Sequence, residues 1–208
     1  MKRTALVLVF VVLAACSSGS ATSSSTSGSD ALKGVFTMVT GKCDTSKPTG
    51  SFFRMVQPGG NAAAGPYVSN PDSTCTDQTV TPLSAGSDGG LKTGSFQTAV
   101  IQPQMFFAVP FDVSTNEKDP QTGSSVKAPS ITRSGSALQG DLSAISVAWN
   151  QQTFNQGAPK PGGGGDGPKG TYDDSTHSYT LEWTSLIQGG PFNGFTGMWH
   201  FEGTFQPA

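Results

Sequence analysis

Residues 179–205, YTLEWTSLIQGGPFNGFTGMWHFEGTF, give the clearest structural signal in the chain, because large apolar side chains recur there at every second position. In 179–186 the rings and Leu alternate with Thr and Glu, and in 195–205 Phe, Trp and Gly alternate with polar residues and Met. A period of two is the spacing of a β-strand with one buried face. Turn-forming residues fill 189–194 between the two runs. We therefore predict an antiparallel pair that reverses through residues 189–194.

The alternation also fixes how the two strands pair. Placing Trp183 opposite Trp199 aligns the two apolar faces, because a slip of one residue would turn every ring to water. Leu181 then lies opposite Phe201, and Glu182 lies opposite His200. The two Trp rings should meet in the core, and the glycines on the apolar face should leave room for neighbouring rings or tight bends.

Similar alternation in the preceding sequence predicts the class of the fold. Strand candidates are residues 35–40 and 52–56, a short buried run at 106–109, and 142–149, where Ile145, Val147 and Trp149 share a face. Segments 57–88, 116–129 and 157–170 are rich in Gly, Pro, Asn and Asp and read as long loops. One-sided alternation is typical of antiparallel sheets, which bury their apolar face against a second sheet or by closing on themselves. We predict an all-β fold, an antiparallel β-sandwich, with a closed antiparallel β-barrel as the alternative.

The N-terminus has the anatomy of a secretory signal: Met-Lys-Arg, an apolar run over 4–12, and then Leu-Ala-Ala-Cys at 13–16. The apolar run is shorter than the ~20 residues that span a bilayer. Leu-Ala-Ala-Cys resembles the lipobox of bacterial lipoproteins. The resemblance implies that residues 1–15 are removed and that Cys16 carries acyl chains, which in pairs or threes anchor stably. The alternative is an ordinary signal peptide in which the Cys is incidental.

These features divide the chain into three parts. Residues 1–15 are the predicted signal peptide, and 16–31 are the lipidated Cys16 with a Ser-rich flexible tether, which has too few apolar side chains to fold alone. Residues 32–208 are a single all-β extracytoplasmic domain. The expected location is the extracytoplasmic face of the cell membrane, with the membrane as a partner through the lipid anchor.

Charge and cysteine usage limit the remaining options. The chain has 12 Lys and Arg against 14 Asp and Glu with no basic cluster, so nucleic acid is not a predicted partner. With Cys16 lipidated, Cys43 and Cys75 remain, and in an oxidising envelope they predict a disulfide. Two free thiols, or half of a metal site, are the alternatives.

Few residues suggest chemistry, and none is assigned as catalytic. No Gly-x-Ser-x-Gly occurs, and a triad would have to use one of two His residues. Glu182, His200 and Glu202 share the polar face of the last two strands and form a candidate ligand or polar-face site. Two carboxyl groups roughly 5–10 Å apart can also cleave glycosides, and neighbouring strands could supply that spacing. Loops of Asp and Asn at 72–77 and 112–119 offer oxygen ligands, but such loops are usually turn chemistry. No metal or cofactor is predicted.

Several phrases resemble a group of secreted actinobacterial proteins and lipoproteins without assigned function. They are FFRMVQPGG (52–60), GPYVSNPDS (65–73), SDGGLKTGSFQ (87–97), FNQGAPKPGG (154–163) and residues 179–205. The resemblance implies an exported envelope protein and supplies no catalytic residues. We therefore expect a lipid-anchored envelope protein whose β domain binds a ligand or an envelope protein and is not an enzyme. The alternatives are a secreted hydrolase acting on glycan or ester and a purely structural surface protein.

Overall fold

The computed structural model describes residues 29–43 and 47–208. These residues form strands, turns and loops, and every strand pair is antiparallel. The predicted all-β antiparallel fold is confirmed. The described part contains no helix of the length and apolarity needed to cross a bilayer. The predicted signal peptide (1–15) and Cys16 lie outside the described residues.

The described residues make fifteen strands in two sheets. In chain order the strands are β1 (Asp30–Leu32), β2 (Gly34–Phe36), β3 (Phe52–Asn61), β4 (Gly65–Tyr67), β5 (Thr81–Pro82), β6 (Leu91–Lys92), β7 (Gln104–Phe106), β8 (Val109–Thr115), β9 (Ser130–Ser134), β10 (Ala137–Asp141), β11 (Ile145–Trp149), β12 (Gln152–Asn155), β13 (Lys169–Tyr172), β14 (Ser178–Leu186) and β15 (Thr196–Pro207). The large sheet runs β1–β9–β10–β13–β14–β15–β2–β6, with β3 beside β15 and with β4 and β5 beside β3. The small sheet runs β12–β11–β8–β7.

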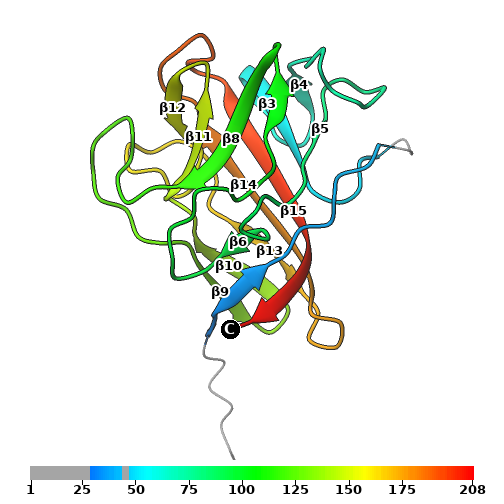
Figure 1. Cartoon of the computed structure of the whole chain (residues 1–208), viewed down its shortest axis with the longest axis vertical. Coiled ribbons are helices and arrows are strands. Elements are labelled where there is room, and N and C mark those ends of the chain that lie inside the picture. Colours follow the sequence, from blue (N-terminus) through cyan, green and yellow to red (C-terminus); the bar gives the residue numbers. More distant parts are fainter. Residues whose placement is uncertain (1–28, 44–46) are drawn as a thin grey trace, which may run out of the picture.

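The large sheet curls because one stretch of chain borders it on two sides. β1 pairs with β9, whereas β2 pairs with β15. Only Lys33 separates β1 from β2, so the path through β9, β10, β13, β14 and β15 begins and ends at the same place in the chain. Figure 1 shows these strands wrapped around the lower half of the molecule.

The small sheet packs against β3 and β15 in the upper half, which is the predicted sandwich (Figure 1). The ring of Phe53 on β3 lies 5.9 Å from that of Phe106 and 6.0 Å from that of Phe111. The β7–β8 turn, the β11–β12 turn and the 187–195 connection gather at the upper end. The first described residues and the C-terminus lie together at the lower end, where the amide of Ala208 donates to the carbonyl of Lys33.

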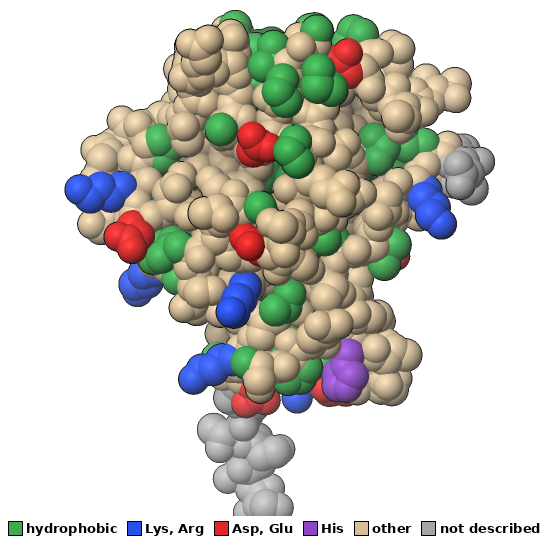
Figure 2. Space-filling model, viewed as in Figure 1, with side chains coloured by type: hydrophobic (Ala, Val, Ile, Leu, Met, Phe, Trp, Pro, Cys, Tyr) green, Lys and Arg blue, Asp and Glu red, His purple; other side chains and the backbone are tan. Residues whose placement is uncertain are grey.

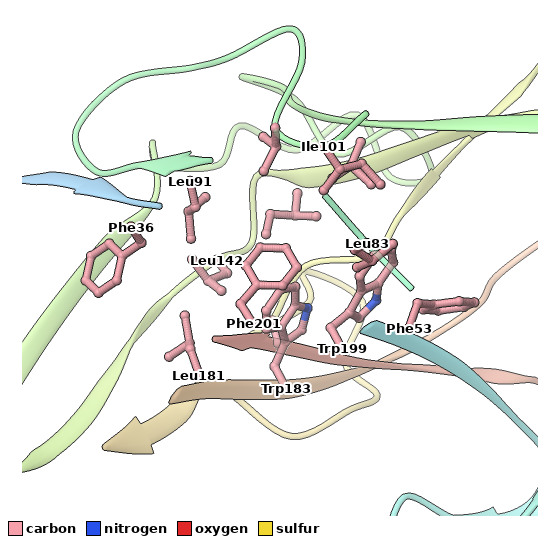
Figure 3. Close-up of a cluster of buried hydrophobic side chains, with 14 of the residues drawn as sticks. Phe36, Phe53, Leu83, Leu91, Ile101, Leu142, Leu181, Trp183, Trp199 and Phe201 are labelled. Atoms are coloured by element: carbon pink, nitrogen blue, oxygen red, sulfur yellow. The ribbon is translucent and has the colours of Figure 1, made fainter. Parts of the chain in front are cut away.

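The β14–β15 pair has the predicted register. Trp183 lies opposite Trp199, Leu181 opposite Phe201, and Glu182 opposite His200. The chain reverses through 189–194, closed by backbone hydrogen bonds between 187 and 194–195. Figure 3 shows the two Trp side chains and Phe201 pointing into the same buried cluster. The apolar face of the β14–β15 pair therefore forms one side of the core.

Two glycines on that face allow close contacts, as their placement suggested. A Cβ on Gly197 would lie 2.1 Å from Oε1 of Gln156, and a Cβ on Gly203 would lie 1.9 Å from the carbonyl oxygen of Thr37. Neither contact leaves room for a side chain. Gly197 thus lets Gln156 reach Trp199 from the other side of the core.

The N-terminal boundary needs a correction. Asp30 and Ala31, which we assigned to the tether, lie in β1 opposite Arg133 and Thr132 of β9. The carboxylate of Asp30 also lies 3.8 Å from Nε of Arg133. Sequence patterning missed this strand because it is held by backbone pairing, and both side chains are exposed.

Two further expectations were wrong. Residues 106–109, expected to be a buried run, form the β7–β8 turn, and Phe107 is 41% exposed. Segment 57–88, expected to be a loop, holds the second half of β3 together with β4 and β5. The pairing of β3 with β4 is short and shifts register between Val56 and Asn61, so it leaves no alternating pattern.

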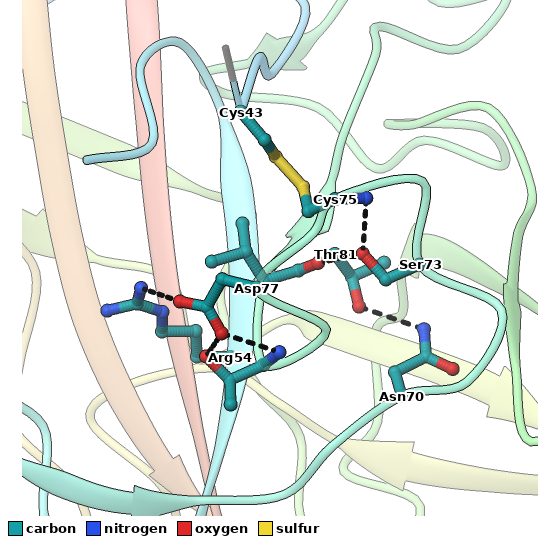
Figure 4. The surroundings of a disulfide bond; sticks show 9 residues. Cys43, Arg54, Asn70, Ser73, Cys75, Asp77 and Thr81 are labelled. Carbon is teal, nitrogen blue, oxygen red and sulfur yellow. Dashed lines mark hydrogen bonds and ion pairs between the residues drawn. A yellow bond between two sulfur atoms is a disulfide. The ribbon is translucent and has the colours of Figure 1, made fainter. Parts of the chain in front are cut away.

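The predicted disulfide between Cys43 and Cys75 is present, with Cα atoms 5.4 Å apart (Figure 4). It belongs to a second, smaller apolar cluster with Phe52 and Val80. Met198, which points outward from β15, packs against this cluster. The disulfide therefore fastens the chain segment that precedes β5 over the outer face of the large sheet.

Candidate functional site

An apolar cavity of about 50 Å³ lies between the two sheets in the upper half of the sandwich. The large sheet and the small sheet each supply part of the lining, and the connections at the upper end supply the rest. The lining residues are Phe53, Met55 and Trp199 from the large sheet, Phe106, Phe111, Val147, Trp149 and Phe154 from the small sheet, and Gln156, Ile187 and Phe192 from the connections.

Two tight turns hold the aromatic rim of this cavity. Phe107 and Ala108 have φ angles of 53° and 58°, and Asn150 and Gln151 have 49° and 59°. Turns with two positive φ angles match the twist of a hairpin, and Asn is among the residues that adopt them readily. Phe at positive φ is strained, and such strain is found most often at functional sites. Here it holds the Phe107 ring in solvent while the neighbouring Phe106 enters the core.

Phe192 lies over the opening between these turns. Its ring centroid is 5.7 Å from that of Phe106, 5.6 Å from Phe107 and 5.4 Å from Trp149. The indole N–H of Trp149 donates to the carbonyl of Phe106 at 2.8 Å, which links the two turns. A half-buried aromatic ring on a glycine-rich connection thus forms the edge of the mouth.

The polar groups around the cavity are already hydrogen-bonded. The indole of Trp199 donates to Oε1 of Gln156 at 3.3 Å, and Nε2 of Gln156 donates to the carbonyl of Asn155 at 3.0 Å. The indole of Trp183 donates to the backbone carbonyl of Gln156 at 2.8 Å. A polar ligand group inside the cavity would lose its water without gaining a free partner, so the cavity suits hydrocarbon.

Glu182, His200 and Glu202 lie together on the opposite, outer face of the large sheet. Nδ1 of His200 lies 2.7 Å from Oε1 of Glu182, and Nε2 lies 3.7 Å from Oε2 of Glu202. The hydrogen bond from His200 lowers the pKa of the Glu182 carboxyl, although partial burial opposes the shift. Lys169 on β13, directly opposite Glu182, contributes to the lowering.

On this outer face the imidazole of His200 is covered, whereas the side chains of Glu182 and Glu202 are 47% and 41% exposed. The ring of Phe52 stacks on the imidazole of His200, with centroids 4.7 Å apart and planes 15° apart. The amide of Gly50 donates to Oε2 of Glu202 at 3.1 Å, and Val39 donates to its carbonyl. The side chain of His200 is 14% exposed. The imidazole is therefore enclosed by two carboxylates and a ring, and it lies on the other side of the sheet from the cavity.

A hollow of about 510 Å³ lies on the same outer face, and Glu202 is one of the residues that line it. Hydroxyl groups line much of it, but they bond to one another: Thr171 to Thr180 at 2.8 Å, and Thr204 to Thr37 at 3.0 Å. The hollow has no buried polar group aimed into it that lacks a partner among the described residues.

A buried lysine is a feature that sequence analysis missed. Lys160 lies in a glycine-rich stretch, yet it is 7% exposed, and its amine donates to the carbonyl of Leu186. Burial lowers the pKa of Lys160 to about 8, and the charge of Asp119 opposes the shift. Asp119, from the 112–119 loop that offers oxygen ligands, is itself buried and accepts hydrogen bonds from Asn155 and Thr122. Among the described residues no three His, Cys, Asp or Glu gather to hold a metal.

The structure thus brings the three polar-face residues together, but it places the cavity elsewhere. Sequence analysis did not single out the rim residues Phe107 and Phe192. A Phe inside the Gly-Gly-Pro-Phe-Asn-Gly turn was the one signal that could have pointed to the mouth, because turns of that composition have no structural need for a large ring. No protein-family model, curated protein or solved structure matches the chain.

Proposed function

We propose that this protein is a lipid-anchored envelope protein that binds an apolar ligand in the cavity between its two sheets and does not catalyse a reaction. The observation that carries the proposal is the cavity itself, lined by apolar side chains and edged by Trp149 and Phe192. Small-molecule sites are typically concave and mostly apolar, and they often lie where two layers meet. The strained, exposed Phe107 adds apolar surface at the mouth.

The position of the cavity supports a role outside the membrane. The tether predicted from the lipobox would join the domain at β1, which lies at the lower end in Figure 1. The mouth lies at the upper end, among the β7–β8 turn and the 187–195 connection. A domain anchored through Cys16 would then present the mouth away from the bilayer that holds it.

The alternatives make different demands on the structure. A hydrolase that used Glu182, Glu202 or His200 would need a substrate cleft at these side chains. Phe52 covers the imidazole of His200, and the hollow that Glu202 helps to line has no unpartnered buried polar group among the described residues. A purely structural protein would leave the cavity without a ligand, which gives the proposal a direct test.

Titration with 1-octanol, followed by tryptophan fluorescence, tests the proposal. Two of the three Trp residues, Trp149 and Trp199, line the cavity, so a bound chain should change the emission in a saturable way. Val147→Phe, which fills the cavity from β11, should abolish the change. Overpacking typically costs about 1–3 kcal/mol, so its folding is checked by circular dichroism.

A milder variant covers the case in which Val147→Phe does not fold. Phe107→Ala removes an exposed ring from the mouth and should weaken octanol binding, whereas Phe96→Ala removes a similarly exposed ring from a loop outside it and should not. A signal that does not saturate would refute ligand binding and favour a purely structural protein. Equal octanol binding by wild type, Val147→Phe and Phe107→Ala would have the same consequence.

A further inference from the structure

We infer that the ligand is an uncharged amphiphile: the end of its aliphatic chain occupies the cavity, and its neutral head group lies among amide side chains at the mouth. This inference rests on the proposed function and names the ligand class for the same site. Three observations carry it: the volume of the cavity, the absence of charged residues from the segments that form its mouth, and the amide side chains in those segments.

The volume favours a chain end over a ring. A void of ~150 Å³ lined by apolar side chains is large enough for benzene. The cavity here is about 50 Å³, so it is too small for a whole ring while the lining keeps its present positions. The narrow end of a hydrocarbon chain fits such a space, and the rest of the chain would lie along the exposed ring of Phe107, which contacts Phe192 at the mouth.

The segments around the mouth carry no charged residue. They are 55–67, 104–111, 147–156 and 186–196, and within these ranges the sequence has no Lys, Arg, His, Asp or Glu. In Figure 2 hydrophobic side chains gather at the upper end of the visible face, and the Lys and Arg side chains lie lower. An ionic head group placed here would lose water without meeting an opposite charge from these segments, which is costly.

Two charged side chains from outside these segments contact them: the buried amine of Lys160 donates to the carbonyl of Leu186, and the carboxylate of Asp72 bonds to the β7–β8 turn. Oδ2 of Asp72 accepts a hydrogen bond from the amide of Ala108 at 2.6 Å, in the β7–β8 turn. Its negative charge disfavours an anionic head further. The same charge would attract a cationic head group, and the test below therefore includes octylammonium.

Amide side chains supply the polar part of the rim. Asn150 and Gln151 form the β11–β12 turn, and Gln152 lies next to Gly190 of the 187–195 connection. Amides both donate and accept hydrogen bonds without a net charge. They match hydroxyl groups on a neutral head, as found on an alcohol or a sugar.

Three probes with the same eight-carbon chain test the inference: 1-octanol, octanoate and octylammonium at pH 7, each titrated into the domain and followed by tryptophan fluorescence. 1-Octanol should bind at least about tenfold more tightly than either ion. Octyl glucoside, with a larger neutral head, should bind no more weakly than 1-octanol. Tighter binding of octylammonium would overturn the inference and assign the selectivity to Asp72.

A charge added to the rim provides the matched control. Gln152→Lys should raise the affinity for octanoate to about that for 1-octanol, whereas Thr98→Lys, at an exposed position outside the mouth segments, should not. If 1-octanol, octanoate and octylammonium bind with equal affinity and Val147→Phe blocks all three, the inferred ligand class is wrong, but the proposed apolar binding site is supported. If none of them binds, the proposed function fails as well.

Discussion

Trp183 and Trp199 stack with nearly parallel rings across the β14–β15 pair, with ring centroids 5.8 Å apart and ring planes 7° apart. Each side chain is 1% exposed. Both indoles donate hydrogen bonds to Gln156, one to its backbone carbonyl and the other to its side chain. Because Trp199 also lines the cavity, the same contacts hold the core together and fix one wall of the proposed site.

Trp199→Ala should therefore destabilise the domain by about 3–5 kcal/mol, the usual cost of truncating a buried large aromatic residue. Urea unfolding followed by far-ultraviolet circular dichroism measures the change. Phe96→Ala, at an exposed ring, should cost within ~0.5 kcal/mol. A cost below about 1 kcal/mol for Trp199→Ala would show that the stacked pair contributes little to stability.

The Glu182–His200 pair should make stability depend on pH at the acidic end. The pKa of Glu182 in the folded protein lies below its ordinary value of about 4.3, chiefly because His200 bonds to its carboxylate. The stabilisation is therefore complete above that ordinary value and is lost as pH falls through the folded-state pKa. Glu182→Gln should be less stable than wild type at pH 7, and the difference should shrink from about pH 5 downward.

Thermal unfolding of both proteins across this range checks the sign. Glu117→Gln, at an exposed glutamate outside the cluster, serves as the control and should not reproduce the effect. A stability difference between wild type and Glu182→Gln that stays constant as the pH falls would contradict the assignment.

Reduction of the Cys43–Cys75 disulfide should lower stability by about 3–4 kcal/mol, because the bond closes a loop with a sequence separation of 32 and restricts the unfolded chain. Urea unfolding with and without reductant measures the effect, and Cys75→Ser should match the reduced protein. Alkylation of both thiols in the folded, unreduced domain would show that the bond does not form.

The anchor remains a prediction from the sequence. Mass spectrometry of membrane-extracted protein should show an acylated N-terminal Cys16, and Cys16→Ala should release the protein or leave the signal peptide uncleaved. An unmodified N-terminus at another residue would contradict lipidation, and the protein would then be secreted without a lipid anchor.

The β14–β15 pair could be predicted because two long, adjacent strands show the same period and a short turn joins them. Strands of two or three residues, such as β1 and β5, are too short for a period to appear. The β7–β8 turn was missed because Phe107 and Ala108 are not turn formers, and their positive φ angles are imposed by the surrounding structure.

The polar-face cluster and the cavity also differ in how far the sequence could predict them. The proximity of Glu182 and His200 follows from the strand register, which the alternation determines. The stacking of Phe52 on His200 and the cavity between the sheets depend on contacts between residues far apart in the chain. Periodicity carries no information about such contacts, so neither the covering of His200 by Phe52 nor the cavity could be predicted.

Methyl-resolved NMR during titration with 1-octanol would show whether an apolar chain enters the cavity. Met55, Val147 and Ile187 line the cavity, whereas Ile131 and Leu138 lie in the core on β9 and β10. If the cavity binds the octyl chain, the first three methyl-bearing side chains should show saturable shifts and contacts to that chain, and the other two should change little. The absence of saturable shifts at Met55, Val147 and Ile187 would show that the cavity does not bind an apolar ligand.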